Sequence, residues 1–273
     1  MCLVAVEDAA FAYTAMPVFA HISLRITRGE LFVLLGPNGC GKTTLLDCII
    51  GFKQVHQGRI LLQGRDIARL RPRQIARSLA YVPQQHVKTF PYRVIDVVAM
   101  GHAGYLPWYC QPGPHEYALA EQMLQRTGIW HLRHRPYTQL SGGEGQLVMV
   151  ARALVQQTPC ILMDEPTAHL DLRNELVVLE QTVRLIRDHG ISVIMATHAP
   201  NHIFYFLSQH IPVRIALLHN GRFMAAGLPA EVLTETNLAR LYDIDARIID
   251  APLPGLPGSK LVVPLATRMK GSS

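Results

Sequence analysis

GPNGCGKTT, residues 36–44, is the stretch from which the fold of this chain is predicted. It lies between the apolar run Leu31–Leu35 and a second apolar segment at residues 45–50, which is the pattern of a strand, a glycine-rich turn and a helix. Glycines allow backbone conformations that a side chain would forbid, so successive N–H groups and the N-terminus of the helix can converge on an anion. The stretch therefore predicts a loop that binds the phosphates of a nucleotide.

Two side chains of this loop suit a nucleotide bound together with Mg²⁺. Lys42 provides a mobile positive charge for the outer phosphates, and the hydroxyl of Thr43 is a hard oxygen ligand of the kind that Mg²⁺ prefers. We therefore predict Mg²⁺ as a cofactor and Thr43 as one of its ligands. The residues predicted to bind the nucleotide are Gly36, Pro37, Asn38, Gly39, Cys40, Gly41, Lys42, Thr43 and Thr44.

The composition limits the classes of protein to which the chain can belong. At 273 residues and 49% hydrophobic content, it is long enough for one large domain or two small ones. Its apolar runs are much shorter than the roughly 18 residues of a membrane span, and Glu7 and Asp8 lie where a signal peptide would be apolar. Five cysteines without a C-x-x-C pair argue against a disulfide framework or a structural zinc site, and they favour the cytosol.

The charged and histidine residues do not form an obvious further site. A net charge of +6 permits nucleic acid, an anionic membrane surface or neither as a partner. The histidine pairs 131/134 and 198/202 have poor metal-binding context, because Pro200 interrupts the second pair and no carboxylate partner is evident. One modest basic cluster is typical of a solvated face, and it contains Arg65, Arg69, Arg71, Arg73 and Arg77.

Strand and helix patterns alternate along most of the chain, which predicts an α/β fold. Residues 3–6 and 21–26 predict a small antiparallel sheet beside the nucleotide. Tyr13 precedes the second of these strands. It is expected either to stack on an adenine ring or to be an ordinary core or surface tyrosine.

Residues 86–138 interrupt this alternation with five prolines and many aromatic residues. Helical patterns at residues 94–100 and 115–127 predict a helical subdomain, which we extend to about residue 155. Its aromatic side chains are expected either to line a groove for a partner's helix or to pack a loop-rich subdomain. These side chains are Phe90, Tyr92, Tyr105, Trp108 and Tyr109.

Two carboxylates at the end of an apolar run indicate hydrolysis. ILMDEP, residues 161–166, predicts a strand that ends at Asp164 and Glu165. Asp164 is expected to hold Mg²⁺, directly or through water, and Glu165 to orient and deprotonate an attacking water. A solvated turn is the alternative, and the apolar run together with the upstream phosphate loop argues against it.

A second anion site is predicted at LSGGEGQ, residues 140–146. Ser141 is a plausible N-cap of a helix, and Gly142 and Gly143 allow a ligand to approach closely. Since one phosphate loop already occurs in the chain, this second site requires a nucleotide from another copy.

Taken together and in this order, these motifs, with Gln84, residues 168–171 and Thr197-His198, resemble the ATP-binding subunits of ABC transporters from residue 1 to about 250. The resemblance implies a P-loop NTPase (RecA-like) core, an antiparallel β subdomain, and a helical subdomain at about 86–155 that carries the ABC signature. Residues 251–273 are then a proline- and glycine-rich C-terminal extension. In that family the phosphate loop of one copy and the signature of the other enclose each ATP, which implies a homodimer.

The same resemblance assigns roles to four further residues. It implies that Tyr13 stacks on adenine, that Gln84 links the Mg²⁺ site to the helical subdomain and takes part in catalysis, and that Asp171 contacts the opposite subunit. It also implies that His198 reaches the γ-phosphate, which agrees with a donor expected at the exit of a strand adjoining the phosphate loop. The chain departs from the family at Glu144, where glutamine is usual, and at His169, where a small residue is common.

YVPQ at residues 81–84, followed by residues 94–101, resembles importers of metal chelates: ferric siderophores, haem, cobalamin and, in close relatives, molybdate or tungstate. This implies ATP hydrolysis at the cytoplasmic face of the inner membrane, with separate membrane-spanning permease subunits and, indirectly, a solute-binding protein. The alternative is a soluble ABC ATPase for assembly or repair. No nucleic-acid partner is expected, because the chain lacks a long coiled-coil insertion and a second ATPase cassette. The solute itself is not determined by this sequence.

Overall fold

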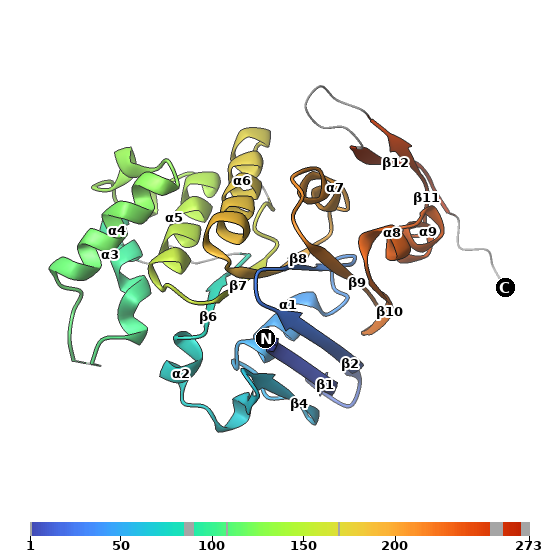
Figure 1. Ribbon diagram of the computed structural model, residues 1–273, viewed down its shortest axis with the longest axis horizontal. Coiled ribbons are helices and arrows are strands. Elements are labelled where there is room, and N and C mark those ends of the chain that lie inside the picture. The colour runs from blue at the N-terminus through green and yellow to red at the C-terminus, as the bar shows by residue number, and fades with distance from the viewer. Residues whose placement is uncertain (1, 85–89, 108, 169, 252–258, 269–273) are drawn as a thin grey trace.

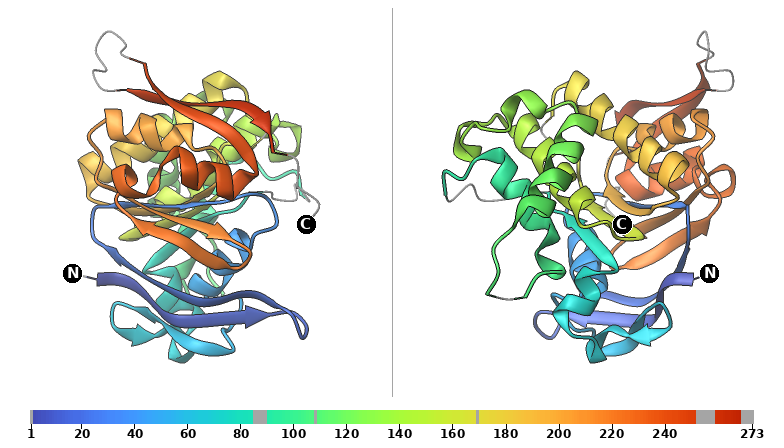
Figure 2. Two further views of the ribbon diagram at one scale, coloured as in Figure 1. Left: turned by 90° about the vertical axis from the view of Figure 1, so that its right-hand side faces the viewer. Right: turned by 60° about the vertical axis from the view of Figure 1, so that its left-hand side comes forward.

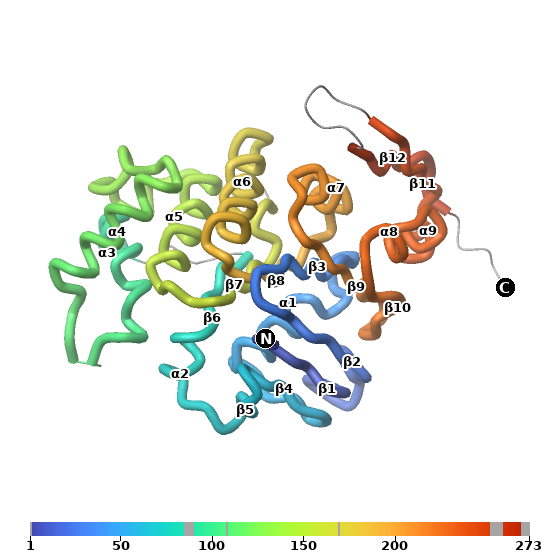
Figure 3. Tube along the Cα trace, viewed as in Figure 1, coloured from blue at the N-terminus to red at the C-terminus, as the bar shows by residue number. Residues whose placement is uncertain are grey.

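The computed structural model describes residues 2–84, 90–107, 109–168, 170–251 and 259–268. Its centre is a six-stranded sheet in the order β10-β9-β3-β8-β7-β6, in which only β10 is antiparallel to its neighbour. Figure 3 shows β3 in the middle of this sheet, between β8 and β9. The strands are β3 Leu31–Leu35, β6 Leu79–Val82, β7 Cys160–Asp164, β8 Ser192–Thr197, β9 Val213–His219 and β10 Arg222–Gly227.

Strands β3, β7 and β8 are buried along their whole length because both faces of the sheet are covered. Leu31 and Val33 belong to the core beneath helices α5, α6 and α7, whereas Phe32 and Leu34 belong to the core around α1. This arrangement confirms the predicted α/β core. The covering helices are α1 Lys42–Ile49, α5 Gly142–Val155, α6 Leu172–His189 and α7 Asn201–Ser208.

A second, antiparallel sheet shares the core around α1 and has the order β2-β1-β4-β5 (Figure 3). Its strands are β1 Cys2–Ala12, β2 Pro17–Thr27, β4 Gln57–Leu62 and β5 Arg65–Asp66. The first two are much longer than the predicted 3–6 and 21–26. In β1 the register shifts between Val6 and Ala9, and Asp8 has a φ of 46°, so a bulge carries the polar residues there within a continuous strand.

The predicted helical subdomain corresponds to α3, η2, α4 and α5, which pack together at one side of the molecule (Figure 1). Of its aromatic residues, Phe90, Tyr92 and Tyr109 are exposed, while Trp108 lies outside the described residues, as do 85–89 and His169. Besides β6, the elements between β5 and α5 are η1 Ile67–Arg69, α2 Pro72–Ala76, α3 Val94–Ala99, η2 Met100–Gly104, α4 Pro114–Arg126, η3 Trp130–Leu132 and η4 Tyr137–Gln139.

Close packing between η2 and α5 depends on Gly101. A Cβ added there would lie 2.2 Å from the carbonyl oxygen of Arg152. We expect Gly101→Ala to lower the free energy of unfolding by about 1–3 kcal/mol, because the two segments must separate. Urea unfolding followed by circular dichroism measures this, with Gly142→Ala as the control, since a Cβ at Gly142 meets no atom within 4 Å. Equal stability of the two variants would contradict the prediction.

The C-terminal part forms a hairpin over α7 (Figure 2). Asn201 at the start of α7 binds the backbone of Val262 in both directions: its Oδ1 accepts from the N–H at 2.8 Å, and its Nδ2 donates to the carbonyl at 3.4 Å. The predicted division at residue 250 therefore lies between two paired strands. The elements are α8 Pro229–Val232, α9 Glu235–Tyr242, β11 Ile244–Asp250 and β12 Lys260–Thr267. None of the described helices is both long and apolar enough to span a membrane.

Candidate nucleotide-binding site

The predicted phosphate loop joins β3 to α1, as the sequence indicates. Gly41 precedes α1 with a φ of 106°, in a region that residues with a side chain rarely occupy. A Cβ at Gly36 would lie 2.5 Å from the carbonyl oxygen of Leu218, in the neighbouring strand β9. Both glycines are therefore required by the conformation and packing of the loop.

Lys42 is buried, and its ammonium group is held by oxygen atoms of the site. Nζ donates to the carbonyl oxygens of Gly36 and Pro37 at 2.8 and 2.9 Å. It also lies 3.1 Å from Oε1 of Glu165, as an ion pair rather than a directed hydrogen bond. The cation thus connects the phosphate loop to the carboxylate at the end of β7.

Glu165 follows β7 in a left-handed conformation, with a φ of 45°, and only 4% of its side chain is exposed. Its N–H donates to the carbonyl of Ala196, so the strained turn is fixed against β8. Nδ1 of His198 lies 2.7 Å from Oε2 of Glu165. The expected position of His198, at the exit of a strand adjoining the phosphate loop, is confirmed by the pairing of Leu35 with Thr197.

Asp164 ends β7 and is 1% exposed, and its Oδ1 has no hydrogen-bond partner among the described residues. Burial raises the pKa of Asp164, and a hydrogen bond from Thr43 partly opposes this effect. A buried carboxylate oxygen without a donor, next to the hydroxyl of Thr43, is a donor set that suits a hard cation. The side chains of Asp164 and Thr43 therefore fit Mg²⁺, and Gln84 remains a predicted ligand.

Lys42, Thr43 and Glu165 border one cavity of about 460 Å³, whose lining does not include Asp164 or His198. Tyr13 lies at its edge with 63% of its surface exposed, and its ring contacts Phe11 edge-on and has Nζ of Lys53 5.7 Å from its centroid. A larger cavity, of about 760 Å³, lies near the C-terminal ends of α4, α5 and α6 and contains none of the phosphate loop. The smaller cavity is lined by Tyr13, Val18, Asn38, Gly39, Gly41, Lys42, Thr43, Thr44, Gln84 and Glu165.

The ABC signature segment, residues 140–146, does not line this cavity in the same chain. Ser141 caps α5, as predicted, because its Oγ accepts from the N–H of Glu144 at 3.2 Å. Glu144 in turn accepts from the N–H of Ser141 at 2.8 Å, so the unusual glutamate completes a capping box. Asp171 caps α6 in a similar way, by accepting from the N–H of Asn174 at 2.8 Å. Ser141 and Asp171, at these two helix starts, are both exposed.

Two contacts, one of His198 and one of His202, were not anticipated from the sequence. The hydroxyl of Tyr242, at the end of α9, donates to the carbonyl of His198 at 2.8 Å. His202 has the carboxylate partner that the sequence did not reveal, since its Nε2 lies 2.6 Å from Oε1 of Glu175. Both contacts join residues far apart in the chain, and no local motif marks them.

Tyr242 is therefore predicted to be a positioning residue for His198. We expect Tyr242→Phe to reduce kcat for ATP hydrolysis about tenfold with little change in KM, because the backbone of His198 loses an anchor. Steady-state ATPase assays measure this. Tyr205→Phe on α7 is the matched control, because no hydrogen bond of its hydroxyl is found among the described residues. If Tyr242→Phe has the same kcat as the parent, Tyr242 does not position His198.

Known proteins that are similar to this chain belong to one family. The family model for ABC transporters matches residues 19–168. An uncharacterised ABC transporter ATP-binding protein of Haemophilus influenzae is 38% identical, over 88% of this chain and 89% of its own length. A molybdate import ATP-binding protein of the same organism is 33% identical, over 88% and 87%, and a hemin import ATP-binding protein of Bordetella bronchiseptica is 36% identical, over 90% and 94%.

A solved structure supports the same relationship. A transporter described as being of the metal-chelate ABC type, in an inward-facing conformation, aligns with a TM-score of 0.83 and 32% identity over 97% of both chains. The likeness thus extends past the family match and includes the C-terminal hairpin. The chain belongs to the ABC transporter family, as one of its ATP-binding proteins.

Proposed function

We propose that the chain hydrolyses ATP with Mg²⁺ at the cavity formed by Tyr13, the phosphate loop, Gln84 and Glu165. The convergence of Lys42, Glu165 and His198 is the observation that carries this proposal. Lys42 neutralises the phosphates, while Asp164 and Thr43 hold Mg²⁺ together with Gln84. When bound, Mg²⁺ neutralises charge on the outer phosphates.

Glu165 is the general base in this proposal. Its carboxylate is held at the end of β7, next to the phosphate loop, and deprotonates a water aimed at the γ-phosphate. His198 contacts Oε2 of Glu165 through Nδ1, and its Nε2 can donate a hydrogen bond to the γ-phosphate when both ring nitrogens carry a proton. The stacking of adenine on Tyr13 fixes the other end of the nucleotide.

Two copies of the chain form each complete site in this proposal. Ser141, Gly142 and Gly143 of one copy face the γ-phosphate bound by the other, and Asp171 contacts that other copy. The exposure of Ser141, Gly142 and Asp171, together with their absence from the cavity of their own chain, supports the arrangement. The exposed helix start at Ser141 and Gly142 is suited to an anion brought by a partner, whereas Gly143 is buried beside Asn174.

We infer that this ATPase powers the import of a metal chelate of the iron–siderophore, haem or cobalamin type, or of molybdate or tungstate. The names of the molybdate and hemin import relatives support this class of solute, and so does the metal-chelate type of the structural neighbour. The chain acts at the cytoplasmic face of the inner membrane, bound to a membrane-spanning permease that receives its solute from a binding protein.

Purification together with the membrane protein encoded beside this chain tests the proposal. In proteoliposomes, we expect ATP hydrolysis to require Mg²⁺ and to increase when the transported chelate and its binding protein are added. The hydrolysis rate of the isolated chain should depend on the square of its concentration at low concentration, since two copies form the site. A rate linear in concentration would contradict the shared site. If the chain hydrolyses ATP but no neighbouring gene encodes a membrane protein, the proposed role in transport is contradicted.

A further inference from the structure

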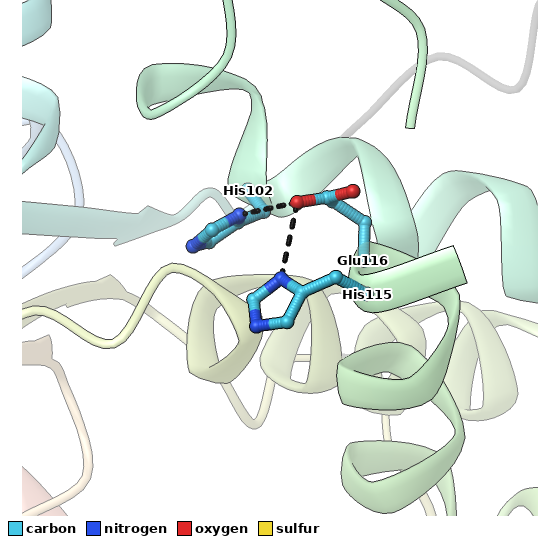
Figure 4. Close-up of side chains that lie close together, drawn as sticks. All are labelled: His102, His115 and Glu116. Carbon is cyan, nitrogen blue, oxygen red and sulfur yellow. Dashed lines mark hydrogen bonds and ion pairs between the residues drawn. The ribbon is translucent and has the colours of Figure 1, made fainter. Parts of the chain in front are cut away.

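Away from the nucleotide cavity, two histidines of the helical subdomain contact the same carboxylate oxygen of a glutamate. Figure 4 shows these three side chains. His102 lies on η2, and His115 and Glu116 lie at the start of α4. Nδ1 of His102 is 3.1 Å from Oε1 of Glu116, and Nδ1 of His115 is 3.2 Å from the same atom. All three atoms lie within 4.8 Å of one another. We propose that His102, His115 and Glu116 form a binding site for a late first-row divalent cation, of which Zn²⁺ is the expected one.

The spacing of the three atoms suits a tetrahedral ion. Zn²⁺ binds imidazole nitrogen and carboxylate oxygen at about 2.0–2.2 Å, which places tetrahedral ligands roughly 3.3–3.5 Å from one another. The two distances to Oε1 are already close to this value. The exposed His115 can move to close the remaining gap, because 70% of its side chain is exposed whereas His102 and Glu116 are nearly buried. Three ligands leave the fourth position to water.

Other contacts hold the two buried ligands in place. The second carboxylate oxygen of Glu116 accepts from the N–H of Gly113 at 2.9 Å, and the ring of His102 stacks on Tyr105 with 4.5 Å between centroids. Such outer contacts orient metal ligands. The hydrogen bond from Gly113 also favours the ionised form of this carboxylate. Among the described residues, Lys and Arg provide no ion pair to this anion.

Ion binding would change the protonation of both rings in a way that can be observed. An ionised carboxylate only accepts, so each Nδ1 that contacts it carries a proton. A cation takes the place of these two protons, and each neutral ring then carries its proton on Nε2 instead. The site therefore replaces two hydrogen bonds by two metal–nitrogen bonds, without a net change in the charge of the rings.

Zn²⁺ titration of the metal-stripped chain, without nucleotide and with Mg²⁺ in excess, tests the proposal independently of ATP hydrolysis. We expect one Zn²⁺ per chain. His115→Ala and Glu116→Gln should each weaken the affinity at least about tenfold, and nitrogen NMR should show Nδ1 of two histidines losing its proton. Glu116→Gln keeps an acceptor for Gly113 and so limits any loss of fold. The control His131→Ala, an exposed histidine of the same subdomain, should bind Zn²⁺ as the parent does.

The absorption spectrum of bound Co²⁺ distinguishes these ligands from the thiolate of the exposed Cys110. The proposed nitrogen and oxygen ligands give a Co²⁺ spectrum without a thiolate charge-transfer band, and Cys110→Ser should leave the affinity unchanged. The proposal is overturned if His115→Ala and Glu116→Gln bind Zn²⁺ as tightly as the parent. Dependence of binding on Cys110 would overturn it as well, and so would the absence of one-to-one binding.

Discussion

Glu165→Gln is expected to reduce kcat for ATP hydrolysis by about 10²–10⁴-fold while ATP still binds. Glutamine has the shape of glutamate but cannot accept the proton of the attacking water. Lys42 keeps the carbonyl oxygens of Gly36 and Pro37 as partners, so the phosphate loop should retain its shape. Single-turnover hydrolysis measures the chemical step, and equilibrium titration with a fluorescent ATP analogue measures binding.

The matched control for this variant is Glu121→Gln, which removes the charge of an exposed glutamate on α4. Its kcat should equal that of the parent. If Glu165→Gln keeps more than half of the parent's single-turnover rate, Glu165 is not the general base. A loss of ATP binding, in contrast, would show that Glu165 supports the phosphate loop rather than the chemistry.

Gly142→Asp is expected to reduce ATP hydrolysis more than about 100-fold without destabilising the chain. A Cβ at this position meets no atom within 4 Å, and an acidic side chain at the first residue of α5 interacts favourably with the helix dipole. In the closed pair, however, the carboxylate would face the phosphates bound by the other copy. Steady-state ATPase assays and thermal unfolding separate the two effects.

Mixing experiments determine whether the signature acts in the other copy. A mixture of Gly142→Asp with Lys42→Ala, which lacks the phosphate-binding cation, should recover part of the activity, because a mixed pair contains one site with both parental halves. Gln63→Asp, at an exposed turn with a φ of 50°, introduces the same charge and should leave hydrolysis unchanged. Full activity of Gly142→Asp alone would exclude a shared site.

Local patterns were sufficient to predict the centre of the site. The phosphate loop, the strand that ends at Asp164 and the cap at Ser141 are each defined by a few consecutive residues, whose periodicity and turn chemistry do not depend on distant contacts. Parallel strands that end at one edge of a sheet then place His198 beside the loop. The long strand β1 was underestimated because its bulge at Asp8 breaks the apolar alternation.

Contacts between distant segments were not predictable in this way. The hydrogen bond from Tyr242 to His198 joins residues 44 positions apart, and the bond between Asn201 and Val262 joins residues 61 positions apart. His102 on η2 and Glu116 on α4 form a contact although they lie 14 positions apart in the sequence. Each contact depends on tertiary packing that a single sequence does not encode in any short pattern.

The contacts of Lys42 have a consequence for the timing of hydrolysis. In the structure, Glu165 is paired with both Lys42 and His198. Under the proposed mechanism, the phosphates of an arriving ATP attract the ammonium group of Lys42 away from Oε1 of Glu165, and this oxygen can then accept a hydrogen bond from the attacking water. In this mechanism, the binding of ATP itself releases the carboxylate that takes part in its hydrolysis.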